Sequence, residues 1–183
     1  MEEEKTSSLS DITRDRFKAD VPGSPEADVY AEGLVAGLLA ESAAGDSDSE
    51  ELLGQILAGL VKGASTTGVS LWLSARGAML GALRAAGACG LDHRQVIDLV
   101  PRILVRETES GGGDFGAAAK GAVEGAIEGA TLTGIDEQSS ANRAATAAYE
   151  AALELRESAA IRIRHITTPA VRGIPTEILE RQS

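Results

Sequence analysis

The feature that most constrains the fold of this chain is an internal period of 44 residues. When the sequence is compared with itself at that shift, glycines fall on glycines and aspartates fall on aspartates. The aligned sets include Gly33/Gly77/Gly121, Gly37/Gly81/Gly125 and Asp48/Asp92/Asp136. A period of about 20 to 50 residues is typical of chains built from similar stacked units, so a repeat array is expected.

Each period has the pattern of two helices. The first helices are expected over residues 25–44, 69–89 and 114–133, and the second helices begin just after the aligned aspartates. Asp48, Asp92 and Asp136 are favourable N-caps, while Gly90 and Gly134 lie where a first helix would end in the left-handed conformation. The last helix is expected over 137–166, before Pro169.

The sequence therefore predicts an all-α fold made of three tandem α-hairpins of about 44 residues, forming a compact bundle or a short solenoid. The repeats would span about 25–68, 69–112 and 113–168 within one domain of residues 25–168. Residues 1–24 are polar and acidic and are interpreted as a flexible arm with one helical turn. Residues 169–183 are interpreted as a tail that could form a short helix.

Glycines spaced four residues apart would form ridges along the first helices. Glycine inside a helix costs about 0.5–1 kcal/mol relative to alanine, so a regular ridge indicates close helix packing. The residues assigned to such packing are Gly33, Gly37, Gly77, Gly81, Gly121, Gly125 and Gly129. The alternative is a composition effect, because the chain holds 31 alanines and 21 glycines.

Composition and charge exclude several classes of protein. The net charge of −11 repels phosphate backbones, which argues against nucleic acid as a partner. The longest uncharged run is the thirteen residues of 63–75, too short to span a bilayer, and the acidic start lacks a signal-peptide pattern. A single cysteine is consistent with a reducing cytoplasm.

The sequence contains no catalytic constellation. The motif at 111–116 matches G-x-G-x-x-G, but no strand precedes it, and it is interpreted as a linker. His93, His165 and Cys89 are too few and too scattered for a zinc site. Glu124 and Glu128 are expected to lie on a solvated helix face. No catalytic, cofactor-binding or metal-ligating residue is therefore assigned.

Charge is distributed unevenly along the chain. Residues 1–60 hold fourteen acidic and four basic side chains, whereas residues 152–183 hold four acidic and five basic ones. Arg156, Arg162, Arg164 and Arg172 form a candidate interaction patch, which could pair with the acidic arm of another subunit.

These observations favour a non-enzymatic assembly or interaction protein that associates with itself through Gly/Ala-rich helix faces. A two-fold dimer is the expected form, with an unidentified protein as a further partner. One alternative is a helical coat protein of a granule or lipid surface, similar to phasins. Another is a small-ligand-binding or enzyme domain with its site at a hairpin junction.

Overall fold

The computed structural model describes residues 8–21, 26–42 and 48–171, and these residues fold as helices and their connections. The α-helices are α1 (Leu9–Asp20), α2 (Ala27–Ser42), α3 (Ser49–Thr67), α4 (Leu71–Ala85), α5 (His93–Ser110), α6 (Phe115–Thr133), α7 (Glu137–Leu155) and α8 (Glu157–Thr167), and a 3₁₀ turn, η2 (Ala86–Cys89), follows α4. The expected all-α class is confirmed, and the described residues contain no strand. Every helix in these ranges is too short or too polar to cross a membrane.

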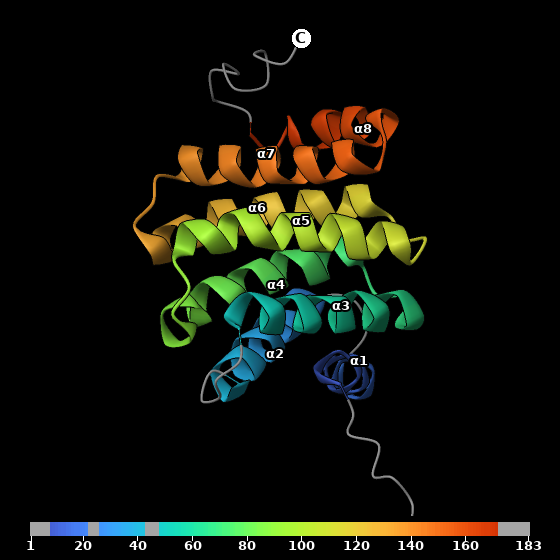
Figure 1. The fold of residues 1–183 in the computed structure, drawn as a ribbon, viewed down its shortest axis with the longest axis vertical. Coiled ribbons are helices and arrows are strands. Elements are labelled where there is room, and N and C mark those ends of the chain that lie inside the picture. Colours follow the sequence, from blue (N-terminus) through green and yellow to red (C-terminus); the bar gives the residue numbers. More distant parts are fainter. Residues whose placement is uncertain (1–7, 22–25, 43–47, 172–183) are drawn as a thin grey trace, which may run out of the picture.

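The helices form two rows, because each helix packs beside the one two places along the chain. One row holds α2, α4 and α6, with α8 at its end, and the other holds α1, α3, α5 and α7. Figure 1 shows the stack from α1 and α2 at the lower end to α7 and α8 at the upper end. Large aliphatic side chains fill the space between the rows: Leu53, Ile56, Leu57, Leu60, Met79, Leu83, Ile97 and Leu104.

Side-chain caps mark where the helices of the second row begin. Asp48 precedes α3 and accepts a hydrogen bond from the backbone N–H of Glu50. Asp92 forms a complete capping box with Gln95 at the start of α5, and Asp136 accepts from Ser139 at the start of α7. These bonds satisfy backbone donors that have no partner within the helix.

Glycines terminate the helices that precede the turns. Gly90 and Gly134 have φ angles of 71° and 66°, and each donates its backbone N–H to a carbonyl of the helix before it. This left-handed conformation strains residues that carry a Cβ, so glycine is favoured at both positions.

The N-terminal part of the chain departs from the expected flexible arm. Residues 9–20 form α1, which packs on α3 and buries Phe17 completely. The cause is a complementary surface on α3, where Gly59 and Gly63 leave room for α1. Residues 1–7 and 22–25 of the arm lie outside the described residues, as do residues 172–183 of the expected tail.

The single long helix expected over 137–166 is also wrong. The chain is extended at Arg156, with φ −172° and ψ 150°, and α8 folds back against α7. The reversal buries Ala159, Ala160 and Ile163 in a second apolar cluster. Burial of this apolar face favours two short helices over one helix that would leave it exposed.

Candidate interaction surfaces

Glycines on α4 and α6 lie against the backbone of the neighbouring helix. A Cβ placed on Gly77 would be 2.0 Å from the carbonyl oxygen of Asp28 on α2, and one on Gly81 would be 2.4 Å from that of Glu32. A Cβ on Gly121 would lie 2.1 Å from the carbonyl oxygen of Trp72 on α4. Real Cβ atoms do not approach so closely, so the missing side chains are what allow these helices to pack at this distance.

The ridge on α6 continues for two more turns. A Cβ on Gly125 would lie 2.7 Å from the carbonyl oxygen of Arg76, and one on Gly129 would lie 2.4 Å from Cδ1 of Leu83. The same principle operates in the other row, where Gly59 of α3 faces the carbonyl oxygen of Ser10 on α1. Gly59 and Gly63 were not assigned to packing from the sequence, although their four-residue spacing is the same signal.

Gly33 and Gly37 on α2 are different, and their assignment to helix packing is wrong for the described chain. Both are exposed, and a Cβ on either would meet no atom within 4 Å. The reason is position: α2 is the first helix of its row, and no described helix lies on its far side. Its glycine ridge is therefore an uncovered counterpart of the ridges on α4 and α6.

A shallow hollow lies over this uncovered face of α2. It has a volume of about 330 Å³ and is lined by Glu26, Val29, Tyr30, Gly33 and Leu34. Val29 beside it has 67 % of its surface exposed. An exposed apolar face of this kind is typical of a contact surface for another protein element.

Tyr30 holds one wall of the hollow in place. Its hydroxyl lies 3.0 Å from the carbonyl oxygen of Arg16 and 3.1 Å from the carboxylate of Asp20, both on α1. Burial, together with the hydrogen bond to Asp20, raises the pKa of Tyr30 to about 12. The phenol is therefore a neutral strut between α1 and α2.

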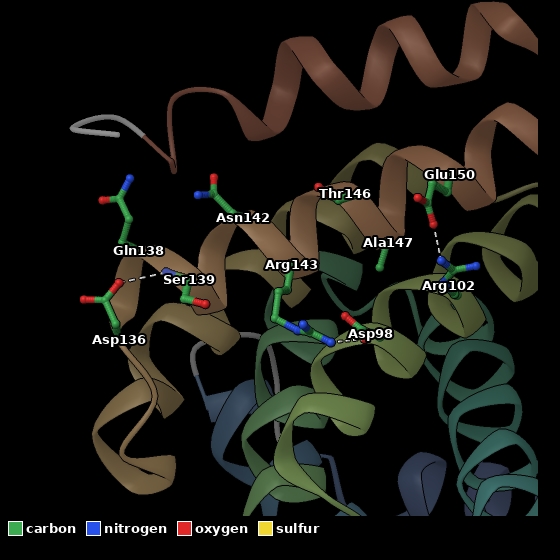
Figure 2. A pocket seen from close by; sticks show the side chains of 10 residues that line it. All are labelled: Asp98, Arg102, Asp136, Gln138, Ser139, Asn142, Arg143, Thr146, Ala147 and Glu150. Atoms are coloured by element: carbon green, nitrogen blue, oxygen red, sulfur yellow. Dashed lines mark hydrogen bonds and ion pairs between the residues drawn. The ribbon is translucent and has the colours of Figure 1, made fainter. Parts of the chain in front are cut away.

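A second, polar hollow of about 610 Å³ lies between α5 and α7, beside the turn that joins α6 to α7. Figure 2 shows its lining, in which Asp98 faces Arg143 and Arg102 faces Glu150 in ion pairs. Both arginines of this hollow are therefore paired with carboxylates, while its third carboxylate, Asp136, caps α7. We interpret them as a clasp between the two helices.

The clasp continues towards the C-terminal ends of α5 and α7. Arg106 pairs with Glu154, and Glu109 pairs with Arg156 at the end of the row. Each pair is partly or largely exposed, and exposed pairs contribute about 0–1 kcal/mol apiece. The ion pairs thus help to align two helices, of which α7 buries almost only alanines and α5 buries larger aliphatic side chains.

Polar contacts also join the helices of the row that contains α2, α4 and α6. Arg76 of α4 bridges its two neighbours, at 2.7 Å from Asp28 on α2 and 2.6 Å from Glu128 on α6. The indole of Trp72 donates a hydrogen bond of 2.6 Å to Glu124. Glu124 and Glu128, expected on a solvated face, therefore take part in the contact between α4 and α6.

The arginine patch expected from the sequence is largely engaged within the chain. Arg156 pairs with Glu109, and Arg162 lies 2.9 Å from Asp114. Both guanidinium groups also lie over the ring of Phe115, at 5.9 and 5.0 Å from its centroid. Arg164 is exposed on α8, while Arg172 lies outside the described residues.

The remaining polar candidates do not come together. His93 is the first residue of α5 and His165 lies in the last turn of α8. The thiol of Cys89 lies 3.5 Å from the carbonyl oxygen of Leu39, and burial raises its pKa. In the described ranges no three His, Cys, Asp or Glu side chains are grouped so that they could hold a metal ion.

Comparisons with protein-family models, with curated protein sequences and with solved structures found no match for this chain.

Proposed function

We propose that this chain is a helical assembly protein whose role is to bind another protein surface, in the first place that of a second copy. The observation that carries the proposal is the uncovered glycine ridge of α2. The corresponding glycine ridges of α4 and α6 each pack against a neighbouring helix. The ridge of α2 lies beside a shallow apolar hollow, and no helix of the described residues packs on it.

We further propose that α2 to α7 are three copies of one α-hairpin, which explains why the ridges correspond. The helices α2, α4 and α6 begin at residues 27, 71 and 115, which are 44 apart. The helices α3, α5 and α7 begin at residues 49, 93 and 137, again 44 apart. The contacts also keep one register: Gly77 faces Asp28 and Gly121 faces Trp72, both 49 residues earlier.

A repeat array has two ends, each of which leaves a face without a neighbour from the array. At the trailing end, α8 packs over α7 and the start of α6 and covers much of that face. At the leading end, α1 covers α3, but the ridge of α2 stays open. The arrangement therefore leaves one site where a further helix fits the pattern of the row.

Solution mass as a function of concentration tests the proposal. Light scattering of the purified chain between micromolar and millimolar concentration should show a mass that rises above the 18.8 kDa of one chain. Gly33→Gln combined with Gly37→Gln should reduce the association. The matched control is Leu132→Gln, which removes an apolar side chain with 48 % exposure from α6 and should leave the association unchanged.

The substitutions on α2 are informative because they do not disturb the fold. Both glycines face open space, and glutamine is a better helix former than glycine. Circular dichroism and thermal unfolding should therefore match or exceed those of the parent chain. A mass of one chain at every concentration would contradict self-association.

A further inference from the structure

We infer that copies of this chain associate head to tail, with α8 of one copy seated on α2 of the next. The inference rests on the proposed self-association and specifies which surfaces meet. It differs from the two-fold dimer expected from the sequence, because a contact between α8 and α2 joins two different surfaces.

The first argument is the location of exposed apolar side chains. Among the large apolar residues of the described ranges, Val29 and Ile161 are the most exposed, at 67 % and 62 %. Val29 lies on α2 and Ile161 on α8, the first and last helices of the same row. The two helices lie at opposite ends of the molecule (Figure 1), so a head-to-tail contact would bring Val29 and Ile161 together and bury both.

The second argument is the direction of the contacts inside the row. Gly77 faces α2 and Gly121 faces α4, so each glycine ridge meets the helix that precedes it in the chain. In neither case does the ridge meet another glycine ridge; its neighbours are the carbonyls of Asp28 and Trp72. A helix that packs on Gly33 in the same way meets it with a face that is not a glycine ridge. Helix α8 meets this condition because it contains no glycine. A second α2 in a symmetric contact would present its own glycine ridge instead.

The face of α8 that remains available carries an exposed apolar side chain beside a basic one. Ile161, Arg164, His165 and Thr168 are all exposed, and their spacing places them on one side of the helix. The opposite side is buried against α6 and α7 through Ala160, Ile163 and Thr167. Ile161 is thus an exposed apolar side chain on this face, which the hollow of about 330 Å³ over Gly33 has room to receive.

Charge complementarity supports the same pairing. Glu26 lies at the rim of the hollow, whereas the acidic residues within α2, Asp28, Glu32 and Glu41, are paired inside the chain with Arg76, Arg84 and Arg16. On α8, Arg162 is paired with Asp114, while Arg164 is exposed on the same side of the helix as Ile161. A contact of α8 with α2 therefore brings Arg164 towards Glu26, whereas α2 on α2 brings Glu26 of one copy towards Glu26 of the other.

A contact between two different surfaces repeats from copy to copy, so it builds an open chain of molecules or a closed ring. A head-to-tail contact is distinguished from a two-fold dimer by mixing two variants, each with one of the two contact surfaces disrupted. The variant with Gly33→Gln and Gly37→Gln keeps only the α8 end, and the variant Ile161→Gln keeps only the α2 face. We expect each variant alone to have the mass of one chain.

An equimolar mixture of the two variants should form a complex of two chains, about twice 18.8 kDa, because one intact α8 meets one intact α2. The parent chain should form larger species, and Leu132→Gln should behave like the parent. The mixture is measured by sedimentation velocity, with one variant labelled so that a hetero-complex is recognised.

Other outcomes overturn the inference in distinguishable ways. If Ile161→Gln alone forms dimers and the α2 variant does not, α2 meets α2, and self-association stands without the head-to-tail contact. If both variants associate like the parent, neither surface is involved. If the parent chain is monomeric throughout, the proposed self-association itself fails.

Discussion

At the residue scale, the position of a glycine in the row of helices determines how the absence of a side chain affects the stability of the fold. Gly33 and Gly77 occupy corresponding places on α2 and α4, but only Gly77 lies against another backbone. The pair is a controlled comparison, since both sit inside a helix and differ in what lies opposite.

We expect Gly33→Ala to raise the free energy of unfolding by about 0.5–1 kcal/mol, since alanine favours a helix and meets no atom here. We expect Gly77→Ala to lower it by about 1–3 kcal/mol, because the new Cβ would overlap the carbonyl of Asp28. Urea unfolding followed by the fluorescence of Trp72, the only tryptophan, measures both. Changes of the same sign would contradict the packing described.

Tyr30 gives a second prediction at this scale. Its pKa is raised from 10.0 to about 12 in the folded chain, so the folded state holds its proton more tightly than the unfolded state. The stabilisation is complete below pH 10 and is lost as the pH rises from about 10 to 12. Tyr30→Phe should therefore show a smaller loss of stability over that pH range than the parent.

Ultraviolet titration checks the ionisation directly. In a Tyr149→Phe background only Tyr30 contributes, since the chain has two tyrosines. A titration midpoint near 10 in the folded protein would show that the contact with Asp20 and the burial do not hold the phenol neutral.

The sequence predicted the glycine ridges but not which of them are covered. The four-residue spacing is the same at Gly33 and at Gly121, and the spacing alone carries no sign of what lies opposite. Coverage depends on whether another helix precedes this one in its row, which is a property of the whole fold. For the same reason Gly59 and Gly63 were missed, because their partner, α1, was not expected to be a helix.

At the scale of elements, α1 depends on one large side chain. Phe17 is completely buried, lies close to Gly63 of α3, and has its ring centroid 5.7 Å from that of Tyr30. Phe17→Ala should cost about 3–5 kcal/mol of unfolding free energy, as expected for a large buried ring. Urea unfolding measures it, with Lys18→Ala as control, since Lys18 is exposed on the same helix. Equal stability of the two variants would show that α1 is not docked.

The ion pairs between helices were within reach of sequence reasoning. Four of them join residues 48 positions apart: Asp28/Arg76, Arg102/Glu150, Arg106/Glu154 and Asp114/Arg162. From α2 to α7, neighbouring helices of a row begin 44 residues apart, and the ion pairs add about one helical turn of four residues to that separation. By contrast, nothing at Arg156 signals the break before α8, because neither glycine nor proline stands there. The break follows from burial of Ala159, Ala160 and Ile163, a tertiary effect.

At the scale of the whole molecule, the two ends of the row differ in charge, and the head-to-tail contact makes that difference measurable. The acidic end has Glu26 at the rim of its hollow, and the basic end has Arg164 beside Ile161. Both groups lie at the surface, so their attraction is modest and is screened by salt. Association should accordingly weaken as the salt concentration rises.

Charge reversal separates attraction at this contact from a general effect of net charge. Arg164→Glu should weaken association several-fold, since it places like charges at the contact. Glu26→Arg should also weaken it, although it makes the acidic chain less acidic and would reduce any general repulsion. The variant carrying both changes again has opposite charges at the contact, now negative at position 164 and positive at position 26. It should recover much of the lost association at low salt. Sedimentation at several protein concentrations measures each constant; if Glu26→Arg strengthens association and the double variant shows no recovery, net charge alone governs the contact and Glu26 does not face Arg164.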